Sequence, residues 1–128
     1  MSQKSMKPFG LALKDFYEGN KQAKVIFHRD DRLREDHYVF PYFCPEKEFS
    51  LIEKQAIRLC KGKVLDIGAR TGPHSSVLQK KGLEVLAIDI SPHACEILTK
   101  KGVKNVMCGT VYDLRDDAFD TILLMGRL

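Results

Sequence analysis

The fold is decided by the stretch Lys63-Val64-Leu65-Asp66-Ile67-Gly68-Ala69-Arg70-Thr71-Gly72. An apolar run that ends in glycines is typical of a buried strand that enters a tight turn. Pro73 suits the first turn of a following helix, and Gly82 is expected to end that helix. Glycines let the backbone approach a bound molecule, and the free N–H groups at the start of a helix point toward it. The strand, turn and helix therefore predict a cradle for a ligand.

A second apolar run, Glu84–Ile90, ends beside an acidic residue. Its Asp89 lies about 20 residues after Gly68, the spacing expected of a carboxylate that binds the hydroxyl groups of a ribose. This spacing predicts a ligand that contains adenosine. A dinucleotide-binding protein would show the pattern G-x-G-x-x-G, whereas here Arg70 separates Gly68 from Gly72 and the third glycine is missing. The pattern therefore disfavours a nicotinamide-dependent oxidoreductase.

The same residues resemble the motifs of the class I S-adenosylmethionine-dependent methyltransferases. The first motif of that family reads V-L-D-x-G-x-G-x-G, and Val64–Gly72 fits every fixed position except Arg70. Asp89 followed by Ser91 is similar to the second motif, and Phe119–Leu124 is similar to a later strand that opens with Phe-Asp. The order and spacing of these motifs carry the resemblance, which covers roughly residues 46–126.

The resemblance implies a fold, a cofactor and a set of binding residues. The fold is α/β, with the doubly wound parallel sheet of the Rossmann-like methyltransferases, and the cofactor is S-adenosylmethionine, released as S-adenosylhomocysteine. Asp89 would bind the ribose, while Asp66 would orient the glycine turn and the amino group of the ligand, or only cap the turn. The implied cofactor-binding residues are Asp66, Gly68, Ala69, Arg70, Gly72, Asp89, Ile90, Thr110 and Val111.

Two of these positions depart from the family pattern. Much of the family has an acidic residue after the third strand, where it meets the adenine amino group, but Gly109 is followed here by Thr110. Adenine would then contact the Thr110 hydroxyl group, the Val111 backbone and the Ile90 side chain. Arg70 replaces a glycine where the backbone passes the methionine part of the ligand, so its side chain is expected to project into solvent or to reach over a carboxylate.

The chain is predicted to comprise an N-terminal cap segment, residues 1–45, and a cofactor-binding core, residues 46–128. The core elements expected from the apolar pattern are a helix Glu46–Cys60 with a buried stripe of Phe49, Ile52, Ala56 and Leu59, the two strands and the helix already described, a helix capped by Ser91 and Pro92, a strand Asn105–Gly109, a loop Thr110–Asp117 and a strand Phe119–Met125. Right-handed crossovers would make the first and fourth strands neighbours and place the ligand at their carboxyl ends.

The cap segment is predicted to be mixed. Its expected elements are a helix Phe9–Tyr17, a strand Ala23–His28, a solvated charged loop Arg29–Asp36 and an extended or edge segment Tyr38–Pro45. Two prolines exclude a central strand for the last segment. Its aromatic rings are expected to cover the end of the sheet or to wall the ligand pocket, and these two interpretations are compatible.

The sequence ends at Leu128, directly after the fourth predicted strand, whereas the family has seven. We therefore expect a truncated fold: either the chain is a piece of a longer protein, or a second copy pairs with the exposed edge of Phe119–Met125. That strand carries none of the inward lysines or prolines that protect natural edges.

Composition limits the other possibilities. No segment approaches the ~20 apolar residues of a membrane span, and the N-terminus leads into no apolar signal segment, so a cytoplasmic protein is expected. The cysteines show no C-x-x-C spacing and the histidines are isolated, which predicts reduced core thiols and no metal site. These cysteines are Cys44, Cys60, Cys95 and Cys108.

Methyl transfer is an in-line displacement with a good leaving group, so the protein contributes mainly proximity and alignment. A base is needed only where the acceptor must lose a proton, and the sequence identifies no catalytic residue. We predict a methyltransferase with a small-molecule acceptor. Scattered lysines and a net charge of +4 leave an RNA acceptor open, and a truncated domain that binds a nucleoside ligand without turnover is the other alternative.

Overall fold

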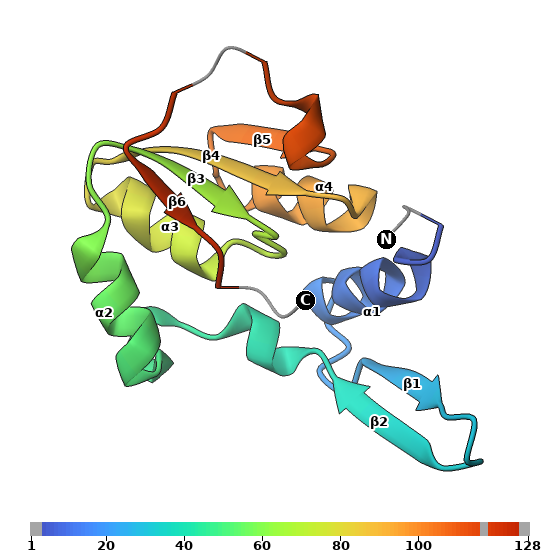
Figure 1. Ribbon diagram of the computed structural model, residues 1–128. Helices are drawn as coiled ribbons and strands as arrows, with labels where there is room; N and C mark the ends of the chain where they lie inside the picture. Colours follow the sequence, from blue (N-terminus) through green and yellow to red (C-terminus); the bar gives the residue numbers. More distant parts are fainter. Residues whose placement is uncertain (1–3, 116–117, 126–128) are drawn as a thin grey trace.

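The computed structural model describes residues 4–115 and 118–125 of the chain, which form a four-stranded parallel sheet, flanking helices and an antiparallel hairpin (Figure 1). The sheet strands are β3 Lys63–Ile67, β4 Glu84–Asp89, β5 Asn105–Cys108 and β6 Thr121–Leu123, the helices are α1 Lys7–Tyr17, α2 Leu51–Leu59, α3 Pro73–Lys80 and α4 Pro92–Lys100, and the hairpin pairs β1 Lys24–His28 with β2 Arg34–Tyr38.

The sheet has the order β5-β4-β3-β6, and all neighbouring strands are parallel. The predicted pairing of the first and fourth core strands is confirmed, since Leu65 of β3 lies opposite Ile122 of β6. The crossover helices α3 and α4 begin as the sequence indicated, with Pro73 and Pro92 in their first turns. The Ser91 hydroxyl group caps α4 by accepting from the Ala94 N–H at 3.3 Å.

The N-terminal helix α1 packs against α4. Leu13 and Phe16 of α1 form a buried cluster with Ala94 and Ile97 of α4. The two helices approach closely at Gly10, where an added Cβ would lie 2.7 Å from the Ser91 hydroxyl oxygen. Residues from the cap segment therefore complete the apolar core behind β4 and β5.

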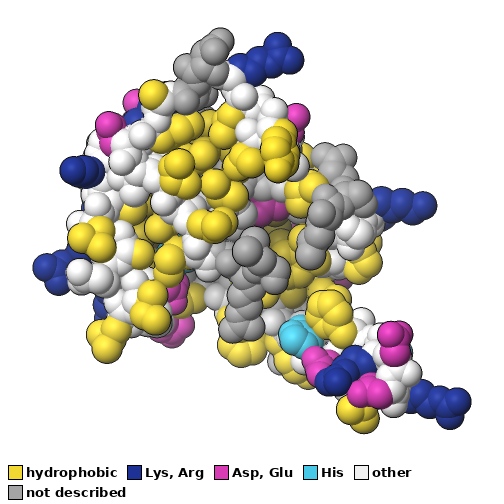
Figure 2. All heavy atoms as spheres, viewed as in Figure 1, with side chains coloured by type: hydrophobic (Ala, Val, Ile, Leu, Met, Phe, Trp, Pro, Cys, Tyr) yellow, Lys and Arg dark blue, Asp and Glu magenta, His cyan; other side chains and the backbone are white. Residues whose placement is uncertain are grey.

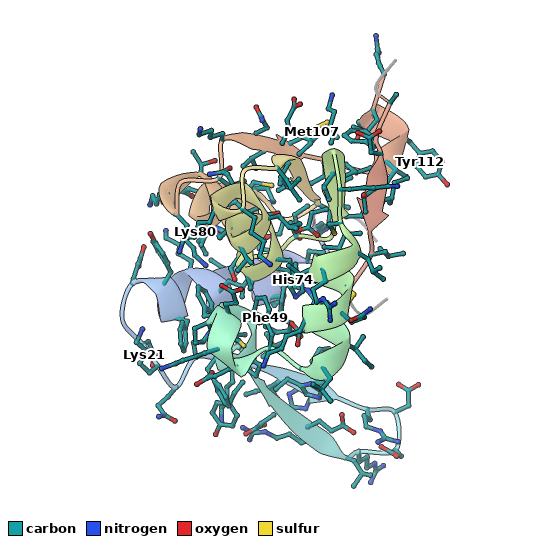
Figure 3. The ribbon with its side chains drawn as sticks, turned by 90° about the vertical axis from the view of Figure 1, so that its left-hand side faces the viewer. Lys21, Phe49, His74, Lys80, Met107 and Tyr112 are labelled. Carbon is teal, nitrogen blue, oxygen red and sulfur yellow. The ribbon has the colours of Figure 1, made fainter. Side chains whose placement is uncertain are left out.

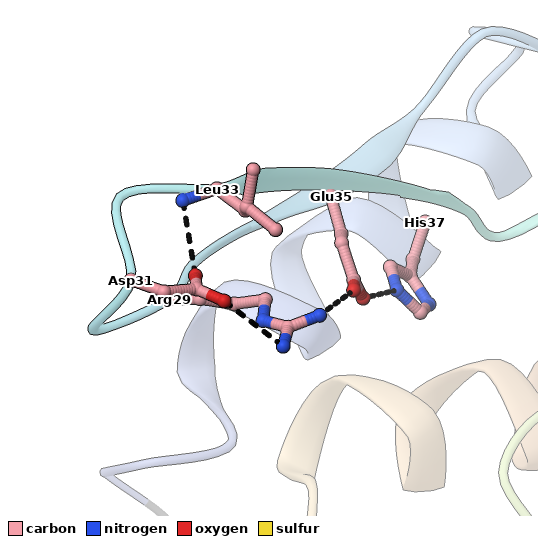
Figure 4. Close-up of polar contacts among 5 residues, drawn as sticks. All are labelled: Arg29, Asp31, Leu33, Glu35 and His37. Atoms are coloured by element: carbon pink, nitrogen blue, oxygen red, sulfur yellow. Dashed lines mark hydrogen bonds and ion pairs between the residues drawn. The ribbon is translucent and has the colours of Figure 1, made fainter.

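The predicted solvated loop Arg29–Asp36 is wrong in its second half, because β2 begins at Arg34. The hairpin stands away from the sheet and all β2 residues are exposed, so charged side chains are tolerated on both of its faces (Figure 1). Opposite charges pair across the hairpin. Lys24 Nζ of β1 lies 2.7 Å from Asp36 Oδ2 of β2. Just after β1, Arg29 Nη1 lies 2.8 Å from Glu35 Oε1 of β2 (Figure 4).

The connection from the hairpin to the core also differs from prediction. Residues Tyr38–Pro45 were expected to be extended, but Phe40–Phe43 form a 3₁₀ helix with a proline in its first turn. The predicted helix Glu46–Cys60 is divided into a 3₁₀ turn, Glu46–Glu48, and α2. A capping box separates them, in which Glu53 N–H donates to Ser50 Oγ and Ser50 N–H donates to Glu53 Oε1, each at 3.2 Å.

The late start of α2 changes which side chains are buried. Phe49, just before the helix, and Ile57 are buried against α3 and β3, whereas Ile52 and Leu59 are 74% and 68% exposed. The predicted stripe is therefore wrong at Ile52 and Leu59, because the helix presents a different face than a helix starting at residue 46 would.

The fourth core strand is shorter than the predicted Phe119–Met125, since β6 spans Thr121–Leu123. Its Ile122 and the following Leu124 are exposed. Figure 2 shows hydrophobic side chains gathered over the sheet on the face turned to the viewer, where no helix of the described residues lies (Figure 1). Pairing of a second copy with this edge stays a prediction.

None of the four cysteines, all within the described residues, forms a disulfide, and Cys95 alone among them is buried. Burial raises the pKa of its thiol to about 12. Cys108 is exposed, so its assignment to the core is wrong. It ends an outer strand of the sheet, where one side remains open to solvent. Within residues 4–115 and 118–125, no helix has the length and apolar character needed to cross a lipid bilayer.

Leu13→Ala should lower the free energy of unfolding by about 2–5 kcal/mol, because Leu13 is fully buried between α1 and α4. Leu11→Ala on the same helix is the matched control: because Leu11 is exposed, this variant should lose much less unfolding free energy. Urea denaturation measures both variants. Equally small losses of unfolding free energy in both variants would show that α1 does not pack on the core in solution.

Candidate functional site

The turn after β3 is a compact left-handed structure. Gly68, Arg70 and Gly72 have φ values of 68°, 55° and 78°. Ala69 N–H donates to the Ile88 carbonyl at 3.0 Å, and Gly72 N–H donates to the Ala69 carbonyl at 2.9 Å. We call residues 68–72 the glycine turn. Its hydrogen bonds fix the turn to the end of β4.

Gly72 is the position where the glycine turn meets the helix layer. An added Cβ would lie 2.5 Å from Leu98 Cδ2 of α4, and the positive φ also disfavours any other residue. At Gly68, by contrast, a Cβ would meet no atom of the described residues within 4 Å. The backbone of the turn is therefore packed on one side and open on the other.

Asp89, at the end of β4, joins the glycine turn to α4. Its Oδ2 accepts from the Arg70 N–H at 2.8 Å and its Oδ1 accepts from the Ser91 N–H at 2.9 Å. The residue is only 6% exposed. Each carboxylate oxygen can accept a further hydrogen bond, so Asp89 can hold the turn and bind a ligand hydroxyl group at once.

Asp66, at the end of β3, is buried with 2% exposure, and its Oδ2 accepts from the Ser75 hydroxyl group of α3 at 2.6 Å. Burial raises its pKa to about 6, and the negative charge of Asp89 acts in the same direction. The Ser75 hydrogen bond and the charge of His74 oppose this shift. Asp66 is thus an acid that changes its charge near neutral pH.

A cavity of about 580 Å³ opens beside the glycine turn. It is walled by the turn, by the start of α3, by the first turn of α2 and by the aromatic connection after the hairpin. Its lining residues are His37, Tyr38, Phe40, Pro41, Tyr42, Cys44, Ser50, Ile52, Glu53, Asp66, Gly68, Ala69, Arg70, Pro73, His74 and Met125. The aromatic segment Tyr38–Pro45 therefore forms part of the cavity wall, which is one of the two interpretations drawn from the sequence.

The Arg70 side chain lies over aromatic rings of the cap segment. Its guanidinium carbon is 4.4 Å from the centre of the Tyr42 ring and 6.0 Å from that of Phe9, and the two rings meet edge to face at 5.2 Å. Thr71 strengthens the same contact by donating its hydroxyl hydrogen to the Tyr42 carbonyl. The cap segment and the glycine turn are therefore joined directly.

A sequence model of a protein family, described as a methyltransferase domain, matches residues 65–128, which span the glycine turn, both acids and β6. The chain belongs to this methyltransferase family. No curated protein sequence matches it.

Solved structures agree with this methyltransferase assignment. The chain is 36% identical to an S-adenosylmethionine-dependent methyltransferase from Bacteroides fragilis, solved with S-adenosyl-L-homocysteine, with a TM-score of 0.77 over 92% of this chain and 50% of that one. It therefore spans half the length of that protein.

Two more distant structures share the fold alone. The tRNA (uracil-54, C5)-methyltransferase of Pyrococcus abyssi is 16% identical, with a TM-score of 0.51 over 79% of this chain and 27% of that one. The PH0226 protein of Pyrococcus horikoshii is 23% identical, with a TM-score of 0.50 over 66% and 47%. The Rossmann-like methyltransferase fold predicted from the sequence is confirmed.

In this chain, only some of the cofactor residues expected from the sequence line the cavity. Asp66, Gly68, Ala69 and Arg70 line it. Five others lie outside its lining, namely Gly72, Asp89, Ile90, Thr110 and Val111. Gly72 belongs to the glycine turn itself, and the other four lie at or just after the carboxyl ends of β4 and β5.

Thr110 has local hydrogen-bond partners at the end of β5. Its hydroxyl oxygen accepts from the Tyr112 N–H at 3.2 Å, and its own N–H donates to Asp113 Oδ2 at 2.8 Å. Sequence reasoning missed Asp113, which lies beside Gly109, although the pattern Thr-x-x-Asp is a capping signal. This end of the site therefore has a carboxylate three residues after the position where the family has one.

Sequence reasoning also missed a histidine–carboxylate pair on the cavity wall. His74 Nε2 of α3 lies 2.7 Å from Glu53 Oε2 of α2, and the His74 ring meets Phe49 edge to face at 5.2 Å (Figure 3). Burial raises the pKa of Glu53, but hydrogen bonds from His74 and Ser50 outweigh it and leave the pKa below its usual value. The Ser-x-x-Glu capping signal would have placed Glu53 in the first turn of α2.

The pKa of Asp66 predicts a pH-dependent stability. An acid whose pKa is higher in the folded state stabilises the fold below its unfolded pKa, and this contribution is lost as pH rises through the folded value. Between pH 4 and pH 6 the free energy of unfolding of the wild type should fall relative to Asp66→Asn, by on the order of 3 kcal/mol.

Urea denaturation at several pH values measures this difference. Ser75→Ala extends the test, because losing the hydrogen bond that lowers the pKa of Asp66 should carry the decline to higher pH. Parallel pH profiles for the wild type and Asp66→Asn would contradict the prediction.

Proposed function

We propose that this protein is an S-adenosylmethionine-dependent methyltransferase that binds its cofactor at the glycine turn and acts on a small-molecule acceptor. The observation that carries the proposal is the pair of buried acids at the glycine turn: Asp89 accepts a hydrogen bond from the Arg70 N–H of the turn, and Asp66 lies on the cavity wall. The Bacteroides fragilis relative, solved with S-adenosyl-L-homocysteine, supports the same ligand.

The described residues fit such a cofactor. Asp89 has acceptor capacity left for the ribose hydroxyl groups, and Ile90, Thr110 and Val111 follow at the ends of β4 and β5, where the adenine would lie. Asp66 faces the cavity as the partner for the amino group. When bound, S-adenosylmethionine supplies an electrophilic methyl group on a sulfonium.

The cavity supports a small-molecule acceptor. Its volume of about 580 Å³ lies in the range of ordinary small-molecule sites, and Tyr38, Phe40 and Tyr42 give it aromatic walls. These walls would exclude water and orient the acceptor, which is the main contribution that an in-line displacement requires from the protein. The fold-level likeness to a tRNA methyltransferase gives RNA no support of its own.

Calorimetry with S-adenosylhomocysteine and NAD tests the ligand. We expect S-adenosylhomocysteine to bind and NAD not to bind. Asp89→Ala should weaken S-adenosylhomocysteine binding by 10- to 100-fold, about 1–3 kcal/mol, because hydrogen bonds to a carboxylate are lost. Glu96→Ala is the matched control, since Glu96 is exposed on α4 and pairs only with Lys100 among the described residues.

Unchanged affinity in a folded Asp89→Ala variant would overturn the assignment of the site. A methyl-release assay with candidate small-molecule acceptors, beside the binding measurement, separates an enzyme from a domain that binds the nucleoside ligand without turnover.

A further inference from the structure

We propose that Cys95 and Cys108 form a site of reversible oxidative modification, at which a peroxide joins their side chains in a disulfide that weakens ligand binding beyond the end of β5. Both thiols are reduced in the structure. Formation of the bond goes beyond the proposed function and can be tested without a ligand. Its effect on S-adenosylhomocysteine rests on the proposed function.

The first argument is the side of the sheet on which the two cysteines lie. Val106 of β5 packs against Leu98 and Val103, on the side that α4 covers (Figure 1). Side chains alternate along a strand, so Cys108, two residues after Val106, points to the same side. Cys95 precedes Leu98 by one turn of α4 and shares its helix face. The helix and the strand therefore turn the two cysteines toward each other.

The contacts of the Cys95 sulfur give the second argument. Its thiol donates to the Asp89 carbonyl at 3.3 Å and lies 3.8 Å from the carbonyl oxygen of Met107, the residue directly before Cys108. Asp89 is also the residue that pairs in register with Cys108 between β4 and β5. The Cys95 thiol therefore lies against the backbone on either side of the Cys108 position.

The two thiols also act on each other directly. Burial is the largest cause of the raised pKa of Cys95, and Cys108 raises this pKa further through a hydrogen bond and through its charge. Both contributions of Cys108 require its sulfur to lie near that of Cys95. This interaction agrees with the placement that the strand and the helix give.

Exposure sets the order of the chemical steps. Cys108 is exposed and Cys95 is buried, so dissolved peroxide meets Cys108 first. Hydrogen peroxide oxidises the Cys108 thiol to a sulfenic acid, and its other oxygen leaves as water. The Cys95 sulfur then attacks the Cys108 sulfur, the S–O bond breaks, and the hydroxyl group leaves with the Cys95 proton as a second water. The two thiols thus lose two electrons and two protons to the peroxide.

The Asp89 carbonyl connects the thiol pair to the proposed ligand site. It accepts from the Cys95 thiol and, at 2.9 Å, from the Gly109 N–H. A disulfide has no S–H donor and needs an S–S bond of about 2 Å, so its formation draws Cys108 toward α4 and disturbs this link. Thr110, beside which the proposed function places the adenine, follows Gly109 directly. We therefore expect oxidation to weaken binding of the nucleoside part of the ligand.

Treatment with hydrogen peroxide, followed by measurement of the intact mass and by peptide mapping, tests the site. We expect the wild type to lose two hydrogen atoms and to yield one cross-linked peptide that contains Cys95 and Cys108. In calorimetry, the oxidised protein should bind S-adenosylhomocysteine about 10-fold more weakly than the reduced protein. Dithiothreitol should restore both the mass and the affinity.

Three variants identify the reacting sulfurs. Cys108→Ser should bind S-adenosylhomocysteine as the reduced wild type does, and peroxide should not change its affinity. Cys95→Ala keeps the exposed thiol, so peroxide should add oxygen to Cys108 without an internal cross-link. Cys60→Ser is the matched control: Cys60 is partly buried at the end of α2, and this variant should respond to peroxide like the wild type.

Peroxide that only adds oxygen to Cys108 of the wild type, or that links two chains through Cys108, would overturn the proposed site. A Cys95–Cys108 disulfide that leaves S-adenosylhomocysteine affinity unchanged would overturn its effect on the ligand. A reduced wild type that does not bind S-adenosylhomocysteine would overturn the proposed function and that effect with it, while the intact mass would still decide whether the disulfide forms.

Discussion

The arrangement of the site depends on the Asp89 carboxylate, which accepts one backbone N–H from the glycine turn and one from the start of α4. Backbone amides at such positions have no partner within a helix or a strand, so a buried carboxylate is a strong acceptor for both. One side chain thereby fixes the distance between two loops that come from different strands. Gly68 and Arg70, which line the cavity, belong to the turn that this link anchors.

The parallel core was predictable because its signals are local and strong. Apolar runs bounded by glycine define β3 and β4, and Ser91 with Pro92 marks the start of α4. The buried positions of Asp66 and Asp89 follow from the same pattern, since an acid at the end of a buried strand enters the site with the strand. These residues required no knowledge of distant contacts.

The cap segment was harder to predict because its structure depends on contacts between residues far apart in the sequence. The charges of Glu35 and Asp36 suggest a loop until Arg29 and Lys24 are brought beside them by the hairpin. Likewise, Tyr42 shows its role only when the glycine turn lies beneath it. The start of α2 was a different kind of error, because the Ser50–Glu53 capping signal was present in the sequence and outweighed by apolar periodicity.

The hairpin has a consequence for how the cavity responds to its medium. Its strands are held by ladder hydrogen bonds and by exposed ion pairs, with little apolar burial beneath them. Exposed pairs weaken as dissolved ions screen their charges, over distances of about 10 Å at 0.1 M salt. His37 and Tyr38 belong to the hairpin and also line the cavity. Ionic strength therefore acts on the shape of this wall, while the glycine turn and the end of β3, held by hydrogen bonds that the buried Asp89 and Asp66 carboxylates accept, are shielded from it.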